Sequence, residues 1–361
     1  MLEKVQLSEG WNWISLISGE VQPNEVEGLE EARSQTQMGI NDPSWGWFGR
    51  LSSIATGEAY KLDANNDVDV VVAYNAESYL DIQPREVNAG WNWVGYPYEY
   101  PYALDDVFTA SSLAEGDVLL SKSGGMATVV NGAWEGTLET LTPGEGYMLK
   151  HAGNGTTLTL KDRYELPQGY WNAPEMERAR AMKRAASVWS YDTRRFANTM
   201  AIIAKLDVEN AEEYSIGAFV GEECRGEGKV VNGKAYITLG GEAGESVSFR
   251  LYNDFTGAYS EVATQLSFAD MAGSVQEPVA LKVPVQTSID MANANGQQIY
   301  FNGNVLVLGN YDGIASVMTL DGKLVAKTSD DTVTLDGLSD GIYVVVIETA
   351  QGRVVRKISK N

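Results

Sequence analysis

The stretch G-W-N-W-I-S at 10–15 returns as G-W-N-W-V-G at 90–95, so two copies of one phrase use four of the nine tryptophans. Side chains alternate between the two faces of a strand, so the two indoles of each copy share one face and the asparagine takes the other. A paired indole face could stack on sugar rings or fill the centre of a small β unit. Because both copies keep the phrase, we favour core packing, which predicts a central strand at each copy.

A longer match surrounds the two phrases. The segment W-F-G-R-L-S-S-I-A-T-G-E-A-Y-K-L at 47–62 aligns with W-E-G-T-L-E-T-L-T-P-G-E-G-Y-M-L at 134–149. Both fit the pattern W-x-G-x-L-x-x-[IL]-x-x-G-E-x-Y-x-L, and self-similarity of this kind indicates internal repeats. Apolar and polar residues alternate within each copy, as in strands joined by polar turns. We therefore predict two tandem β-rich repeats, over 1–83 and 84–165.

The remainder of the chain divides into three segments. Residues 166–186 contain P-E-M-E-R-A-R-A-M-K-R-A-A, whose proline and helix-forming residues predict a linker with helical character. Short alternating strands separated by glycine-rich turns follow over 187–290 and predict a β-sandwich. Further alternation with D-G and N-G turns over 291–361 predicts a small C-terminal β-sandwich. The fold class predicted for the whole chain is all-β.

Composition limits the classes of function. A chain of 361 residues exceeds the roughly 250 at which single cores stop growing, so we expect several domains. Acidic residues outnumber basic ones 49 to 27, and the net charge of −22 repels phosphate backbones, so we expect no nucleic-acid partner. No apolar run approaches the ~20 residues of a bilayer-spanning helix, and we expect no transmembrane segment.

The inventory of reactive residues is small. A histidine-based nucleophile would have to use His151, the one histidine, while the one cysteine, Cys224, falls in a different predicted domain. The stretch D-A-N-N-D-V-D at 63–69 has the spacing of a calcium loop, but Val68 and Tyr74 occupy the positions of its glycine and glutamate. A solvated hairpin turn is the favoured interpretation. We predict no metal, no cofactor and no catalytic residue.

Aromatic residues that occur in one copy only are better binding candidates than shared ones, because loops that differ between copies carry specificity. Trp45 has no counterpart in the second copy, and the run Y-P-Y-E-Y-P-Y at 96–102 has none in the first. The candidate ligand-binding residues are Trp45, Tyr96, Tyr98, Tyr100 and Tyr102.

Three parts of the chain resemble modules of known families. The segments V-M-T-L-D-G-K-L-V at 317–325, L-S-D-G-I-Y-V-V-V-I at 338–347 and R-V-V-R-K-I-S-K at 353–360 resemble the C-terminal sorting domain of the type IX secretion pathway in Bacteroidetes. The P-N-P phrase that usually opens that domain is replaced by Y-F-N-G-N-V-L-V at 300–307.

Residues 216–226 (I-G-A-F-V-G-E-E-C-R-G) and 248–253 (S-F-R-L-Y-N) resemble an immunoglobulin-like module of the same proteins, and the G-W-N-W repeats are similar to a module found beside it. The resemblance implies no enzymatic activity.

The resemblance also implies a cell-surface or secreted protein that acts in adhesion or binds an extracellular glycan or protein, with the C-terminal module serving export or anchoring. We expect it to be extracellular or associated with the outer membrane, and monomeric.

Two alternatives stay open. Strand-like sequence follows Met1 with no room for a leader, so we expect a fragment or processed form of a longer protein. The modules would then form the non-catalytic tail of a secreted hydrolase or peptidase. In the other alternative, the chain itself is a glycoside hydrolase, since that reaction needs only two carboxylates, for which Glu99, Asp105 and Asp106 are candidates.

Overall fold

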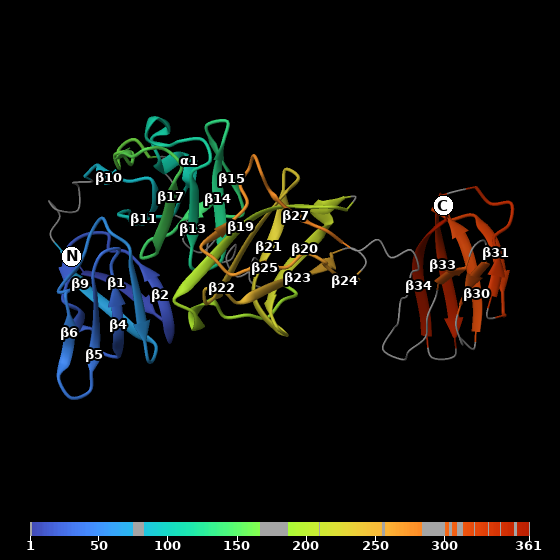
Figure 1. The fold of residues 1–361 in the computed structure, drawn as a ribbon, viewed down its shortest axis with the longest axis horizontal. Helices are drawn as coiled ribbons and strands as arrows, with labels where there is room; N and C mark the ends of the chain where they lie inside the picture. Colours follow the sequence, from blue (N-terminus) through green and yellow to red (C-terminus); the bar gives the residue numbers. More distant parts are fainter. Residues whose placement is uncertain are drawn as a thin grey trace. The chain divides into compact units, whose positions relative to one another are not determined.

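The computed structural model shows an all-β protein, which confirms the predicted fold class (Figure 1). Among the residues it describes, the one α-helix is α1 (Leu104–Val107). The chain divides into two compact units, Met1–Val283 and Pro284–Asn361. The structure describes residues 2–74, 83–166, 187–208, 210–254 and 257–283 of the first unit, and 300–302, 305–308, 313–320, 322–330, 332–339, 341–349 and 352–360 of the second.

The first phrase lies at the edge of a five-stranded antiparallel sheet, which we call the first sheet. Its order is β2 (Gly10–Ile14), β8 (Tyr60–Ala64), β4 (Leu29–Arg33), β5 (Met38–Asp42) and β6 (Gly46–Gly49). A two-stranded sheet of β1 (Leu2–Leu7) and β9 (Val68–Ala73) and a short pair of β3 (Glu20–Val21) and β7 (Ile54–Ala55) complete this body, together with the 3₁₀ turn η1 (Pro23–Glu25). Its core gathers aliphatic side chains such as Leu7, Leu16, Ile54 and Leu62, none of them exposed.

The second phrase begins a sheet with the same order, which we call the second sheet. It runs β11 (Gly90–Gly95), β17 (Gly146–His151), β13 (Val118–Ser121), β14 (Gly125–Val130) and β15 (Ala133–Gly136). Two short pairs accompany it: β10 (Arg85–Val87) with β18 (Thr156–Leu158), and β12 (Tyr102–Ala103) with β16 (Thr140–Leu141). A 3₁₀ turn, η3 (Ala110–Ser112), follows α1.

The two five-stranded bodies join through reciprocal backbone contacts. Ile14 bridges to Glu145, and Val94 bridges to Glu58, so each phrase meets the G-E-x-Y segment of the other body. The side chain of Gln35 adds two bonds to β11, because its Nε2 donates to Trp91 O (3.0 Å) and its Oε1 accepts from Trp93 N (3.0 Å). The two bodies therefore form one continuous structure.

The rest of the first unit is a nine-stranded mixed sheet, which we call the third body. Its order is β24 (Tyr259–Glu261), β23 (Ser246–Asn253), β20 (Tyr214–Val220), β21 (Glu223–Val231), β22 (Lys234–Gly241), β19 (Asn198–Leu206) and β26 (Met271–Ala272); β25 (Leu266–Ser267) pairs with β23, and β27 (Val279–Leu281) pairs with β19. The 3₁₀ turns η4 (Thr193–Arg195) and η5 (Ala211–Glu213) precede β19 and β20. Apolar side chains of alternating strand positions form its core, among them Ile202, Ile237 and Phe249.

The second unit has its own small core around Leu306, Val317, Val345 and Ile358. One sheet contains β28 (Tyr300–Asn302), β29 (Val305–Val307) and β32 (Thr332–Thr334); the other runs β31 (Leu324–Thr328), β30 (Gly313–Thr319), β33 (Gly341–Thr349) and β34 (Gly352–Lys360). The predicted linker falls almost wholly on 167–186, outside the described residues. No helix in the described part of the chain combines the length and apolarity needed to cross a bilayer.

Candidate functional site

Each phrase is fixed by a glycine and an asparagine. Gly10 and Gly90 have φ of +92° and +87°, a left-handed conformation that favours glycine. Asn12 then bonds back across this turn: its Nδ2 donates to Ser8 O (2.7 Å) and Gly10 O (2.8 Å), and its Oδ1 accepts from Ser8 N (3.0 Å). Asn92 makes the same three bonds, at 2.8 to 2.9 Å. Both asparagines thus face away from the indoles, as alternation predicts.

The indoles lie on the outer faces of the two sheets, and the prediction that they fill the centre of each β unit is wrong. Trp13, 5% exposed, packs where the three bodies of the first unit meet, with Trp91 and Trp93 packed against the same cluster. The other members come from the second sheet and the third body: Val118, Leu120, Met126, Met148, Ala201, Ile203 and Tyr236. Alternation puts the two indoles on one face, but it does not say which face is the inner one.

Two lysines accompany the indoles at this junction. Lys61 Nζ lies 5.1 Å from the Trp13 ring and 4.9 Å from the Trp93 ring, and Lys122 Nζ lies 5.6 Å from Trp13, so all three contacts are cation–π pairs. Burial, then the charge of the neighbouring Arg33, lowers the pKa of Lys61 to about 8. Burial, then the charge of Lys61, lowers the pKa of Lys122 to about 7.

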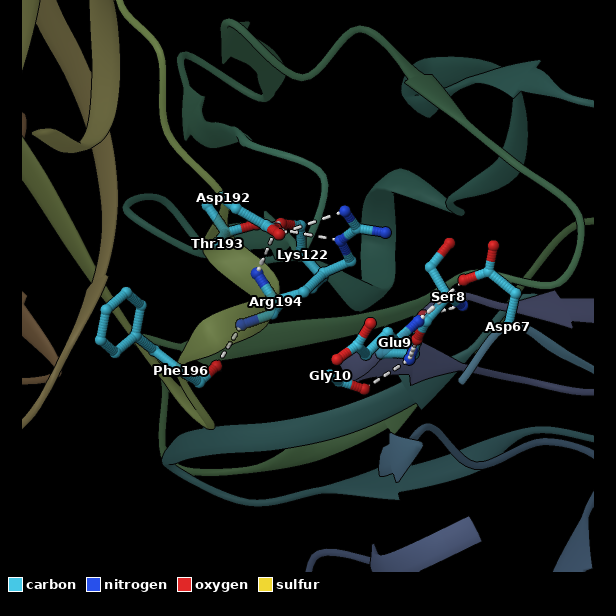
Figure 2. A network of polar contacts seen from close by, with 10 residues as sticks. Ser8, Glu9, Gly10, Asp67, Lys122, Asp192, Thr193, Arg194 and Phe196 are labelled. Carbon is cyan, nitrogen blue, oxygen red and sulfur yellow. Dashed lines mark hydrogen bonds and ion pairs between the residues drawn. The ribbon is translucent and has the colours of Figure 1, made fainter. Parts of the chain in front are cut away.

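The turn η4 covers the first phrase (Figure 2). Asp192 caps it, since its Oδ1 accepts from Arg194 N (3.0 Å) and Arg194 Nε (2.9 Å). Thr193 Oγ1 donates to Lys122 O (2.9 Å), and Lys122 Nζ donates to Phe196 O (2.5 Å). A Cβ at Gly10 would lie 2.7 Å from Arg194 O, so the turn packs directly on the phrase. These contacts tie the second sheet and η4 to the first sheet.

A cavity of about 1300 Å³ opens at this junction. Strands β1 and β2 form one wall, loops of the second sheet around 122–125 and 136–145 form another, and residues 187–194 with 227–231 form the third. Its aromatic lining consists of Trp11, Trp13, Tyr74, Tyr100, Trp189 and Tyr191, and its acidic lining of Glu3, Glu99, Glu139, Glu145, Asp192 and Glu227. Ring faces offer a stacking surface and carboxylates accept hydrogen bonds, a combination suited to a polyhydroxylated or peptide ligand.

One carboxylate of this lining is preorganised. Glu3 is 5% exposed, and its side chain accepts from Ile17 N (2.9 Å) and Ser18 N (3.5 Å). Burial raises the pKa of Glu3, and these two backbone bonds oppose the rise. Glu99 belongs to the same lining and accepts from Tyr74 Oη (3.4 Å).

The structure separates the five predicted binding residues. Tyr96 and Tyr98 are each 1% exposed and Tyr102 is 8% exposed, so these three belong to the core of the second β body, and a surface-loop role for them is wrong. The Tyr98 and Tyr102 rings pack edge to face, and the Tyr96 ring is tilted by 56° against that of Tyr98. Tyr96 Oη and Tyr98 Oη donate to backbone carbonyls at 2.6 Å. Tyr100 lines the cavity. Trp45, 86% exposed, lies at the β5–β6 hairpin and outside the cavity lining.

The reactive residues have structural surroundings. His151 is buried at the end of β17, where its Nδ1 lies 3.0 Å from Asp117 Oδ1. Cys224 is half-buried, and burial raises the pKa of its thiol to about 11.

The residues of the calcium-like stretch serve separate contacts: Asp67 accepts from Glu9 N (3.0 Å), and Asp69 pairs with Lys4 (2.7 Å). Within the described ranges, no three His, Cys, Asp or Glu side chains form a group that could hold a metal ion.

The sequence did not point to Lys61, Lys122, Trp189 or η4 as parts of the site. Lys61 stands at an unassigned position of the repeat pattern, and neither Trp189 nor η4 belongs to a repeated phrase. Their importance comes from contacts with distant parts of the chain: Lys61 meets Trp93, 32 residues away, and η4 meets Gly10, 184 residues before Arg194. No protein-family model and no curated protein matches this sequence.

Proposed function

We propose that this chain is a non-enzymatic cell-surface or secreted protein that binds an extracellular glycan or protein ligand in adhesion. In this proposal, two copies of one β module and an immunoglobulin-like β-sandwich form the binding body. The C-terminal sorting-like module serves export or anchoring. The observation that carries the proposal is the cavity of about 1300 Å³ lined by both aromatic rings and carboxylates.

The surroundings of the reactive residues support a binding role over catalysis. His151 is held by the buried Asp117, and the raised thiol pKa of Cys224 leaves little thiolate at neutral pH. The charge of −22 disfavours polyanionic partners such as nucleic acid. Among the cavity residues, Tyr100 is a partly exposed ring beside Glu99, and this pair is the best candidate for ligand contact.

The test is to screen the purified chain against immobilised glycans and extracellular-matrix proteins. We expect binding to at least one class, weakened about tenfold, or roughly 1.4 kcal/mol, in Tyr100→Ala. Tyr164→Ala is the matched control, because Tyr164 is 78% exposed and lies outside the cavity lining. A screen without any binding, or equal losses in both variants, would contradict the proposal.

A further inference from the structure

Two carboxylates of the cavity lining, those of Glu3 and Glu99, meet neutral donors. The Glu3 carboxylate accepts from two backbone N–H groups, and the Glu99 carboxylate accepts from Tyr74 Oη (3.4 Å). Burial, then the charges of Glu99 and Glu3, raises the pKa of Tyr74, so both carboxylates act on the same ring. Neither carboxylate forms an ion pair with a described residue.

A third carboxylate of the lining, that of Glu227, comes from β21 of the third body. It accepts from Ser187 Oγ (2.6 Å), another neutral donor. Burial, then the charge of Glu227, raises the pKa of Tyr191, so an aromatic ring of the lining lies beside this carboxylate too. Within the described part of the chain, Glu227 also has no ion pair.

The basic side chains of the lining do not neutralise these three carboxylates. Three of the four have an oxygen partner elsewhere, and the fourth, Lys229, is exposed. The three pairs are Arg194 with Asp192 (2.9 Å; Figure 2), Lys4 with Asp69 (2.7 Å), and Lys122 with the backbone oxygen of Phe196 (2.5 Å). Arg163, whose charge also acts on Tyr74, donates to Pro97 O and lies outside the lining. The cavity therefore has a place for cations that a ligand would bring.

The rings of the lining favour the same kind of ligand. An ammonium or guanidinium group gains a charge-assisted hydrogen bond from a carboxylate and a cation–π contact from a neighbouring ring. Trp13 and Trp189 also belong to the lining, and the Nε1 donor of each is buried without an acceptor among the described residues. Such donors are costly without an acceptor, and the backbone of a bound polypeptide brings carbonyl oxygens.

We propose that the cavity binds a basic segment of a protein, whose lysine or arginine side chains pair with Glu3, Glu99 and Glu227. This inference rests on the proposed function, because it names the ligand class of the same cavity. A neutral glycan would leave the three carboxylates without a cation. An acidic chain would set like charges against them.

The test is fluorescence anisotropy of the full chain with a labelled decapeptide of alternating glycine and arginine, in about 0.15 M salt. We expect saturable binding, and none to a decapeptide of alternating glycine and glutamate. Glu99→Gln and Glu227→Gln should each raise the dissociation constant about tenfold, because they remove a charge and keep the shape and an acceptor oxygen. Glu27→Gln is the matched control, since Glu27 is exposed and lies outside the lining, and its effect should stay below about twofold.

The outcomes separate this inference from the proposed function. Suppose that the chain binds a glycan or matrix protein and Tyr100→Ala weakens that binding, while the arginine peptide does not bind. The ligand class is then wrong, and the binding function stands. Equal losses in Glu27→Gln and Glu227→Gln would assign peptide binding to the overall charge and overturn the inference. Thermal unfolding of each variant separates a loss of folding from a loss of binding. A chain that binds neither the peptide nor any member of the screen overturns both proposals.

Discussion

At the scale of single residues, one asparagine closes the turn ahead of each phrase. Asn12 and Asn92 each satisfy two backbone carbonyls and one backbone N–H, all part-buried. Removing the side chain leaves buried backbone groups without partners, which costs more than the bonds themselves contribute. The asparagine is thus as constrained as the two tryptophans beside it.

We expect Asn12→Ala and Asn92→Ala each to lower the free energy of unfolding by about 1–3 kcal/mol. Denaturant unfolding followed by tryptophan fluorescence measures the loss. Asn66→Ala, at an exposed turn position, is the control and should stay within about 0.5 kcal/mol of the parent protein. Equal losses at all three positions would show that the hydrogen bonds of Asn12 and Asn92 do not contribute to the free energy of unfolding.

The lowered pKa of Lys122 predicts that the free energy of unfolding rises with pH. Its folded pKa of about 7 lies below the ordinary value of 10.5, so between these limits the unfolded chain binds more protons and folding gains from a rise in pH. From pH 7 to 9 the gain is about 2 kcal/mol. Lys122→Met should remove this gain and leave the smaller rise expected from Lys61, whose folded pKa is about 8, whereas Lys4→Met, with its exposed amine, should keep the whole rise. Parallel pH profiles for the parent protein and Lys122→Met would contradict the prediction.

At the scale of elements, the two phrases differ in what covers them. Both begin with a left-handed glycine, but η4 packs on Gly10, whereas no atom lies within 4 Å of the Cβ position at Gly90. Two turns that share this glycine and the phrase after it therefore tolerate change differently. The difference arises because Arg194 of η4, 184 residues beyond Gly10, covers only one of them.

The matched pair Gly10→Ala and Gly90→Ala tests this difference. Gly90→Ala should cost about 1–2 kcal/mol, the penalty of a left-handed alanine. Gly10→Ala should cost about 1–3 kcal/mol more, because its Cβ would overlap the Arg194 carbonyl oxygen. Thermal unfolding compares the two. Equal losses would mean that η4 moves aside without cost.

At the scale of the whole molecule, Glu135 links the second sheet to the third body. Burial raises the pKa of this carboxyl, but hydrogen bonds from Tyr236, Asn232 and Lys234 outweigh burial and hold it below the ordinary value of 4.5. Because the folded pKa of Glu135 is lowered, ionised Glu135 stabilises the folded protein fully above about pH 4.5. This stabilisation is lost as the pH falls through the folded pKa.

Glu135→Ala should lower the stability of the Met1–Val283 unit at pH 7 by about 1–3 kcal/mol, because Tyr236 loses its acceptor. The difference from the parent protein should shrink as the solution is acidified below pH 4.5. Calorimetry of the full chain at pH 7 and pH 4 measures both effects. Glu86→Ala, an exposed change on β10, is the control. If the difference in stability between the parent protein and Glu135→Ala grew on acidification, the pKa of Glu135 would be raised in the folded protein, and the prediction would be wrong.

Sequence reasoning succeeded where the cause is local. It predicted the all-β class and the opposite orientation of asparagine and indole, because both follow from alternation along one strand. It failed at Tyr96, Tyr98 and Tyr102, since a proline-rich tyrosine run has the composition of a surface loop. Their burial depends on acceptors such as Lys161 O, 63 residues beyond Tyr98.

The sequence alone determined that this protein is built from alternating strands, that two stretches match, and that paired indoles share a face in each. Only the tertiary structure decided which face that is and what covers it. Trp13 packs at a junction of three bodies, and Met38, Ile40 and Phe48 of the first sheet stay exposed, whereas the matching face of the second sheet meets β22. The physical reason is that period-two alternation fixes relative orientation within a strand. Burial depends on surfaces brought together from distant parts of the chain.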